Sequence, residues 1–176
     1  MSAALPPGSV IAIDHGTART GFAVADALRL AIEPLDVFHG KGDGDPLLQH
    51  VERLVADRTV AALLVGLPLH ADGREGGRAK DVRAFCARLS ARLPGTRILF
   101  WDEHLTTKEA ESRLVEAGHT GAARKARKDS WSALVLLEDW MRAGEPEGVQ
   151  LPQVDSPSPS PGPGGSGDAE SPELGH

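Results

Sequence analysis

The sequence predicts an α/β protein built on a mixed five-stranded sheet flanked by helices. Three short strand-like segments between residues 10 and 38 are joined by short loops, which predicts an antiparallel meander. Two later apolar segments each follow a stretch with helical periodicity. Right-handed crossover connections would place these two strands parallel to the first strand. The order is therefore three antiparallel strands followed by two parallel ones.

The first strand carries the most informative feature of the chain. Val10 to Ile13 is an apolar, mostly β-branched run that leads directly into Asp14, and Gly16 follows two residues later. A carboxylate at the end of a buried strand is costly unless it has a partner, and a cation is the obvious partner. The alternative is that Asp14 only stabilises the turn into Gly16.

The next elements complete the meander and the first crossover. Thr20–Asp26 is predicted as the second strand, and Ala31–Phe38 as an edge strand because it contains Pro34. Asp45 is predicted as a helix N-cap that precedes Pro46 in the first turn. The helix buries apolar residues at helical spacing, namely Leu47, Leu48, Val51, Leu54 and Val55.

Two buried strands and one helix follow. Val60–Val65 is continuously apolar and ends at Gly66, which is typical of a strand covered on both faces. Arg78–Leu93 is predicted as a helix, and Arg97–Trp101 as the last strand, which ends at Asp102 and Glu103. In such a sheet, sites form at the strand ends where the topology switches. We therefore expect Asp14, Gly66 and Glu103 to share one edge.

The remaining segments are two helices, a basic loop and a tail. A capping box of Thr106 and Glu109 opens a helix that runs to about Ala117. Residues 118–128 are mostly Gly, Ala, Arg and Lys and are predicted as a mobile basic loop, and Asp129–Met141 is predicted as the last helix. Residues 1–8 are predicted as a loose lead-in, 9–143 as one domain, and 144–176 as a disordered acidic tail rich in Pro, Ser and Gly.

The charge balance permits a polyanionic partner. The net charge of the 176 residues is −6, but the tail holds six acids and no Lys or Arg, so residues 1–143 are formally neutral. The single cysteine, Cys86, cannot form an internal disulfide. The start of the chain lacks the pattern of a signal peptide, and no apolar run is long enough to span a bilayer. A cytoplasmic location without a membrane partner is expected.

Three acids could hold metal ions for phosphodiester hydrolysis. Two divalent ions about 4 Å apart can activate water and stabilise the leaving oxygen, provided that carboxylates hold them. The candidates are Asp14, one of Asp102 and Glu103, and Asp129, and the ions would be Mg²⁺ or Mn²⁺. Neighbouring strand residues point to opposite faces, so only one of Asp102 and Glu103 can point inward. Asp129 could instead be an N-cap, and Glu103 an ordinary loop acid.

Further residues could support such a site. Thr17 could contribute its hydroxyl, although a turn role is the plainer interpretation. A basic cluster lies directly before Asp129 and could bind a nucleic-acid backbone or form only a solvated face; it comprises Arg124, Lys125, Arg127 and Lys128. The pattern Asp-x-Gly-Thr after a strand also occurs in ATPases of the actin and hexokinase type. Those folds need a second phosphate loop and more chain, so we rank ATP binding low.

Four motifs in this order resemble the YqgF family of RNase H-like proteins. They span about residues 9–142 and read Ile11-Ala12-Ile13-Asp14-His15-Gly16-Thr17 with Arg19, Val65-Gly66-Leu67-Pro68-Leu69, Asp102-Glu103-His104-Leu105-Thr106-Thr107, and Asp129-Ser130-Trp131-Ser132-Ala133. The resemblance implies an RNase H-like fold and a metal-dependent nuclease. It implies that Asp14, Glu103 and Asp129 form the acidic triad, that Asp102 is a supporting acid, and that Arg19 meets phosphate. His104 departs from the usual Arg, and Ser132 from the usual Ala.

Three functions follow from these observations. The first is a nuclease that acts on structured RNA and matures the pre-16S ribosomal RNA. The second is a Holliday junction resolvase, which would act on branched DNA as a symmetric dimer. The third is an RNA-binding factor for ribosome assembly with little turnover. The chain itself could be a monomer or a homodimer.

Overall fold

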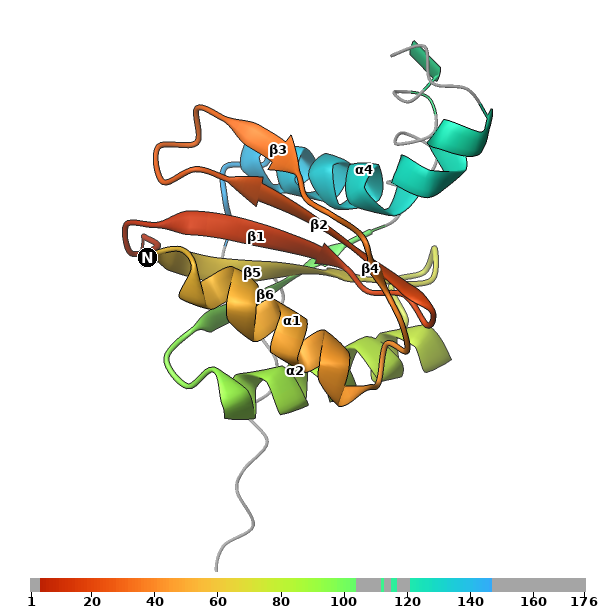
Figure 1. Ribbon diagram of the computed structural model, residues 1–176, viewed down its shortest axis with the longest axis horizontal. Helices are drawn as coiled ribbons and strands as arrows, with labels where there is room; N and C mark the ends of the chain where they lie inside the picture. The colour runs from red at the N-terminus through yellow and green to blue at the C-terminus, as the bar shows by residue number, and fades with distance from the viewer. Residues whose placement is uncertain (1–3, 104–111, 113–114, 117–120, 147–176) are drawn as a thin grey trace, which may run out of the picture.

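The computed structural model describes residues 4–103, 112, 115–116 and 121–146, the segment 121–129 by its backbone alone. Six strands and three helices are defined in this part of the chain (Figure 1). In chain order they are β1 (Ser9–Asp14), β2 (Arg19–Ala25), β3 (Ile32–Pro34), β4 (Phe38–His39), α1 (Asp45–Ala56), β5 (Val60–Leu67), α2 (Gly77–Arg92), β6 (Arg97–Asp102) and α4 (Gly121–Arg142).

The sheet has the predicted mixed topology. Its order is β3-β2-β1-β5-β6, with β4 paired to β2 beside this path. β1 is antiparallel to β2, with Asp14 opposite Gly21, and parallel to β5, with Ile13 opposite Val65. β5 is in turn parallel to β6, with Leu67 opposite Asp102. The predicted fold class is therefore confirmed, and β5 lies between the two strands that carry Asp14 and Asp102.

The predicted edge strand over residues 31–38 is two short strands instead. β3 ends at Pro34, which has no N–H to donate to a ladder, and β4 begins only at Phe38. The N–H of Leu35 still donates to the carbonyl of Phe22 at 2.8 Å, which keeps the intervening segment close to β2. The proline thus divides the strand as well as marking the edge.

Helices cover both faces of the sheet (Figure 1). The alternation of β1 sends Ile11 and Ile13 into the core that α1 and α2 cover. Val10 and Ala12 point to the other face, where they pack with Leu137 and Trp140 of α4. Both faces of the central strands are dry, which explains their continuous apolar sequence.

Two boundaries differ from the expected ones. α1 has Gly44 as its N-cap, so Asp45 is the first helical residue and its carboxylate lies in the first turn. α4 begins at Gly121, so the prediction of a basic loop up to residue 128 is wrong for residues 121–128. Ala, Arg and Lys favour helix strongly, and this propensity outweighs the lack of apolar side chains.

Most of the predicted helix from Thr106 to Ala117 and nearly all of the predicted tail lie outside the described residues; positions 112, 115 and 116 are described and are helical. In the described part of the chain, no helix has the length and apolar character needed to cross a membrane.

Candidate active site

Asp14 and Glu103 meet at the edge of the sheet. Asp14 is the last residue of β1, and Glu103 directly follows β6, where its N–H donates to the carbonyl of Leu67 at 3.2 Å. A side-chain hydrogen bond joins the two carboxyl groups across the intervening strand. Gly66 of β5 leaves the space for this, because a Cβ there would lie 2.8 Å from Glu103 Oε2. The expectation that Asp14, Gly66 and Glu103 share one edge agrees with this arrangement.

The electrostatics of this pair favour a bound cation. Burial raises the pKa of Glu103, and the negative charge of Asp102 adds to that effect. The positive charge of Arg78 and the hydrogen bond with Asp14 act in the opposite direction. Two carboxyl groups in contact must share a proton or a cation, and hard divalent ions prefer such oxygen ligands. The pair therefore has the donor chemistry expected for Mg²⁺ or Mn²⁺.

The structure shows which of Asp102 and Glu103 points inward. Asp102 is exposed at the end of β6, whereas Glu103 is half-buried and bonded to Asp14. Glu103 is therefore the inward acid, and the charge of Asp102 acts on it.

The third acid lies on α4. The backbone of Asp129 is inside this helix, so the alternative that Asp129 is its N-cap is wrong. The next residue, Ser130, is buried, and its hydroxyl donates to the carbonyl of Leu35 at 2.5 Å, which anchors this part of α4 to the meander. The side chains of Asp129 and of the basic cluster, Arg124, Lys125, Arg127 and Lys128, lie outside the described part of the chain. Among the described residues, no group of three or more His, Cys, Asp or Glu side chains gathers as a metal site.

Two further candidates, Thr17 and Arg19, lie in and directly after the turn between β1 and β2. Gly16 is required here, because a Cβ would lie 1.9 Å from the carbonyl oxygen of Arg19. Thr17 is exposed in the turn, and Arg19 is half-buried as the first residue of β2, opposite His39. Both therefore lie within a few residues of Asp14.

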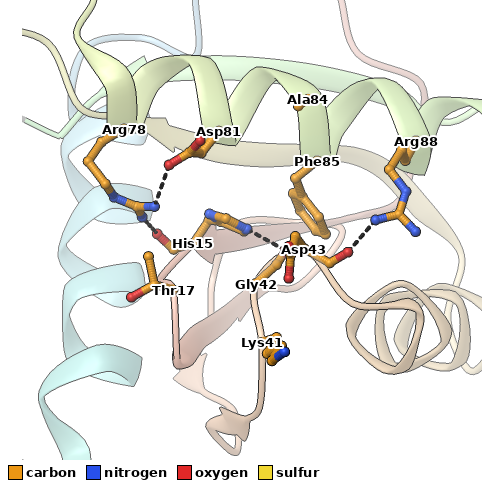
Figure 2. Close-up of a pocket in the computed structure, with 10 residues that line it drawn as sticks. All are labelled: His15, Thr17, Lys41, Gly42, Asp43, Arg78, Asp81, Ala84, Phe85 and Arg88. Atoms are coloured by element: carbon orange, nitrogen blue, oxygen red, sulfur yellow. Dashed lines mark hydrogen bonds and ion pairs between the residues drawn. The ribbon is translucent and has the colours of Figure 1, made fainter.

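A cavity of about 410 Å³ opens beside this turn and was not predicted from the sequence (Figure 2). It lies between the turn, the loop that precedes α1, and α2. Its walls contain three cationic side chains, Lys41, Arg78 and Arg88. These residues are far apart in the chain, and no motif or spacing connects them, so no sequence signal could have found the cavity.

His15 forms part of the cavity wall. Its Nε2 donates to the carbonyl of Gly42 at 2.8 Å, and its ring packs on Phe85 with the centroids 4.6 Å apart. Burial lowers the pKa of His15, and the hydrogen bond to Gly42 opposes this effect only in part. The neutral imidazole therefore connects the β1–β2 turn to the loop before α1 at neutral pH.

A family model described as "RuvX: Holliday junction resolvase" matches residues 8–143 of the chain. The chain belongs to the RuvX family. The resemblance to YqgF is thereby confirmed. Membership of this nuclease family assigns the chain a hydrolase activity on the ester bonds of nucleic acids.

Two curated relatives of this chain illustrate the match. A protein of Ruegeria pomeroyi is 40% identical over 141 residues, covering 78% of this chain and 88% of its own. A protein of Sodalis glossinidius is 36% identical over 134 residues, covering 76% of this chain and 94% of its own. Both carry the name "Putative pre-16S rRNA nuclease".

The fold also has a counterpart among solved structures. T. thermophilus RuvC, solved in complex with a Holliday junction substrate, aligns with a TM-score of 0.52 at 16% identity. The match covers 79% of this chain and 98% of RuvC. At this identity the likeness concerns the fold alone, and it confirms the RNase H-like fold class of this chain.

Proposed function

We propose that this protein is a divalent-metal-dependent nuclease that hydrolyses phosphodiester bonds in structured RNA and matures the pre-16S ribosomal RNA. The observation that carries the proposal is the pair of hydrogen-bonded carboxyl groups, Asp14 and Glu103, at the edge where β1, β5 and β6 end. The names of the curated relatives support the substrate. Residues 9–143 would form the nuclease domain, and the single buried Cys86 suits action in the cytoplasm.

The metal site would consist of Asp14, Glu103 and Asp129. The bound Mg²⁺ or Mn²⁺ would lower the pKa of a water and offset charge on the phosphodiester. Asp14 and Glu103 would orient the site, since β1 and β6 hold them on either side of Gly66. Asp102 would support Glu103 through its charge, and Thr17 would offer its hydroxyl beside Asp14.

The basic residues would position the RNA strand. Arg19 lies at the start of β2, next to the turn that follows Asp14, and would contact a backbone phosphate. The cluster of α4 precedes Asp129 on the same helix and would bind phosphates further along the strand; it comprises Arg124, Lys125, Arg127 and Lys128. Such contacts fix the register of the strand without reading its sequence.

Replacement of Asp14 tests the proposal directly. Asp14→Asn removes one negative charge while it keeps the shape of the side chain, so the cation loses a ligand and the fold is retained. We expect cleavage of precursor rRNA in Mg²⁺ or Mn²⁺ to fall by about a thousandfold, because a metal ligand contributes several kcal/mol to the transition state. Asp57→Asn, at an exposed position after α1, is the matched control and should cleave at the wild-type rate. Unchanged cleavage by Asp14→Asn would contradict the site.

A second candidate function is Holliday junction resolution, which the description of the matching family model favours. The same acids would act on a four-way DNA junction, and paired cuts would require a symmetric dimer. Offering the protein precursor rRNA and a four-way junction in parallel, with sedimentation to measure its oligomeric state, separates the two. Strong RNA binding without metal-dependent cleavage would instead indicate a ribosome-assembly factor.

A further inference from the structure

The cationic cavity beside the turn adjoins the acid pair without containing it. His15 and Thr17 line the cavity and directly follow Asp14 in the chain. Arg78, at the start of α2, donates from Nη2 to the carbonyl of His15 at 2.9 Å. The charge of Arg78 also acts on Glu103. The cavity therefore adjoins the turn that follows Asp14, at the edge of the sheet where the acid pair lies.

The three cations that line the cavity come from different segments of the chain. Figure 2 shows Arg78 and Arg88 on α2 at two ends of the cavity, Arg78 toward His15 and Arg88 toward Asp43, with Lys41 on the loop before α1. Arg78 reaches Asp81 at 3.3 Å, and Arg88 reaches Asp45 at 2.6 Å and also the carbonyl of Asp43. Each guanidinium has five N–H groups, so donors are left for a ligand.

Lys41 adds a charge that is not committed elsewhere. Its side chain is exposed, and within the described residues it contacts no carboxylate in an ion pair. Three cations and two acids, Asp43 and Asp81, line the cavity, so its walls carry a net positive charge. The cavity thus favours a negatively charged ligand.

Contacts within the protein hold the walls of the cavity in place, so the cavity is preformed. His15 Nε2 bonds the carbonyl of Gly42, and the N–H of Gly42 donates to the carbonyl of Thr17 at 3.0 Å. The loops pack so closely that a Cβ at Gly42 would lie 2.2 Å from the carbonyl oxygen of Gly16. Ala84 and Phe85 of α2 form an apolar wall of the cavity, across from these loops. Because these loops are already ordered, little free energy is lost in ordering them when a ligand binds.

We propose that this cavity is a subsite for a backbone phosphate of the nucleic-acid strand that lies against Asp14 and Glu103, with Lys41 and Arg78 as its principal contacts and Arg88 at its far side. The inference rests on the proposed function for the presence of a strand at the acid pair. The ligand class follows from the excess of cations over acids in the lining, and the apolar wall would receive the adjoining sugar. Neither Lys41 nor Arg78 belongs to the basic residues expected from the sequence to bind nucleic acid.

The test measures RNA binding in protein that carries Asp14→Asn, so that the result does not depend on cleavage. Lys41→Gln and Arg78→Gln are added separately, and affinity for a structured rRNA fragment is measured across a salt series. Each variant should weaken binding and reduce the steepness of log K against log salt by ~0.7–0.9, the effect of one lost phosphate contact. Arg92→Gln, on the same helix but paired with Glu52 at 3.4 Å, is the matched control and should leave the slope unchanged.

A second arm identifies the ligand as a backbone phosphate. Single uncharged methylphosphonate linkages are placed at successive positions of the strand. One position should weaken binding to the parent protein and have no further effect once Lys41→Gln is present. Slopes equal to those of the parent in both variants, or binding of free inorganic phosphate or mononucleotide without any change in RNA affinity, would overturn the subsite. If the slopes change as expected but the protein with Asp14 intact does not cleave precursor rRNA in Mg²⁺ or Mn²⁺, the result counts against the proposed function alone.

Discussion

Gly66 sets the position of the Glu103 carboxylate. It belongs to the central strand β5, whose other residues are mostly large and apolar. A Cβ at this position would lie 2.8 Å from Glu103 Oε2 and 3.3 Å from Leu136 Cδ2. The nearest atom is the far end of a flexible side chain, which can move aside at little cost to the fold. The missing side chain therefore matters more for the site than for stability.

This distinction predicts the effect of Gly66→Ala. The added methyl group should displace the Glu103 carboxylate, so the cleavage rate should fall by about tenfold or more, because misplacement by about 1 Å is enough for such a loss. The thermal unfolding midpoint should change little. Nuclease assays combined with calorimetry measure both quantities. Gly77→Ala, where a Cβ would have no neighbour within 4 Å, is the control. A large loss of stability with full activity would contradict the interpretation.

At the scale of the elements, α4 is held by packing along its second half and extended toward its N-terminus by helix propensity. Its second half packs against β1 and β2 through a buried face that includes Leu137 and Trp140. Trp101 of β6 donates to Asp139 at 2.8 Å, which connects this helix to the strand that carries Glu103 to the site. Because α4 extends back to Gly121, the backbone of Asp129 lies within a continuous helix anchored by these contacts.

We expect the Asp26 carboxylate, in the hairpin between β2 and β3, to make the stability of the fold depend on pH. Asp26 Oδ1 accepts hydrogen bonds from the N–H groups of Ala31 and Leu30, and these bonds, first that of Ala31, lower the pKa of Asp26. A carboxylate whose pKa is lowered by folding stabilises the protein above its unfolded pKa of about 3.9, and this stabilisation is lost as the pH falls through the folded pKa.

Asp26→Ala should therefore lower the unfolding midpoint at pH 7, and the difference from wild type should shrink as the pH falls below about 4. Unfolding curves recorded over a pH series measure this difference. Asp57→Ala, which also removes one exposed carboxylate, corrects for the change in net charge. A difference that stays constant down to pH 2 would show that the hydrogen bonds do not depend on the charge of Asp26.

At the scale of the whole molecule, a set of contacts made by Arg29 and the acid pair lie at opposite ends of β1. β1 begins at Ser9 and delivers Asp14 at its far end. Beside its start, Arg29 donates to the carbonyls of Gly8 and Asp26 at 2.9 and 2.7 Å and pairs with Glu145 at 3.2 Å. One side chain thus joins the start of β1, the β2–β3 hairpin and the segment after α4.

Arg29→Gln tests this separation of roles. Several hydrogen bonds to a charged group are lost, so the free energy of unfolding should fall by about 1–3 kcal/mol. The cleavage rate below the unfolding transition should not change, because the acid pair lies at the other end of β1. Denaturant titration and nuclease assays test the two expectations. Arg142→Gln, at an exposed position of α4, provides the comparison. A reduced cleavage rate in folded Arg29→Gln would show that the two ends are coupled.

The sequence by itself determined the elements, their pairing in the sheet and the strand ends that carry Asp14 and Glu103. These features depend on local periodicity and loop length, which neighbouring residues determine, and on the general right-handedness of crossovers. The helix over residues 121–128 was missed because its apolar periodicity is absent, although its helix propensity is high. Local alternation left open which of Asp102 and Glu103 points inward, and the tertiary structure shows that Glu103 meets Asp14 and that Lys41, Arg78 and Arg88 line one cavity. Both depend on contacts between segments distant in the chain, which no local pattern records.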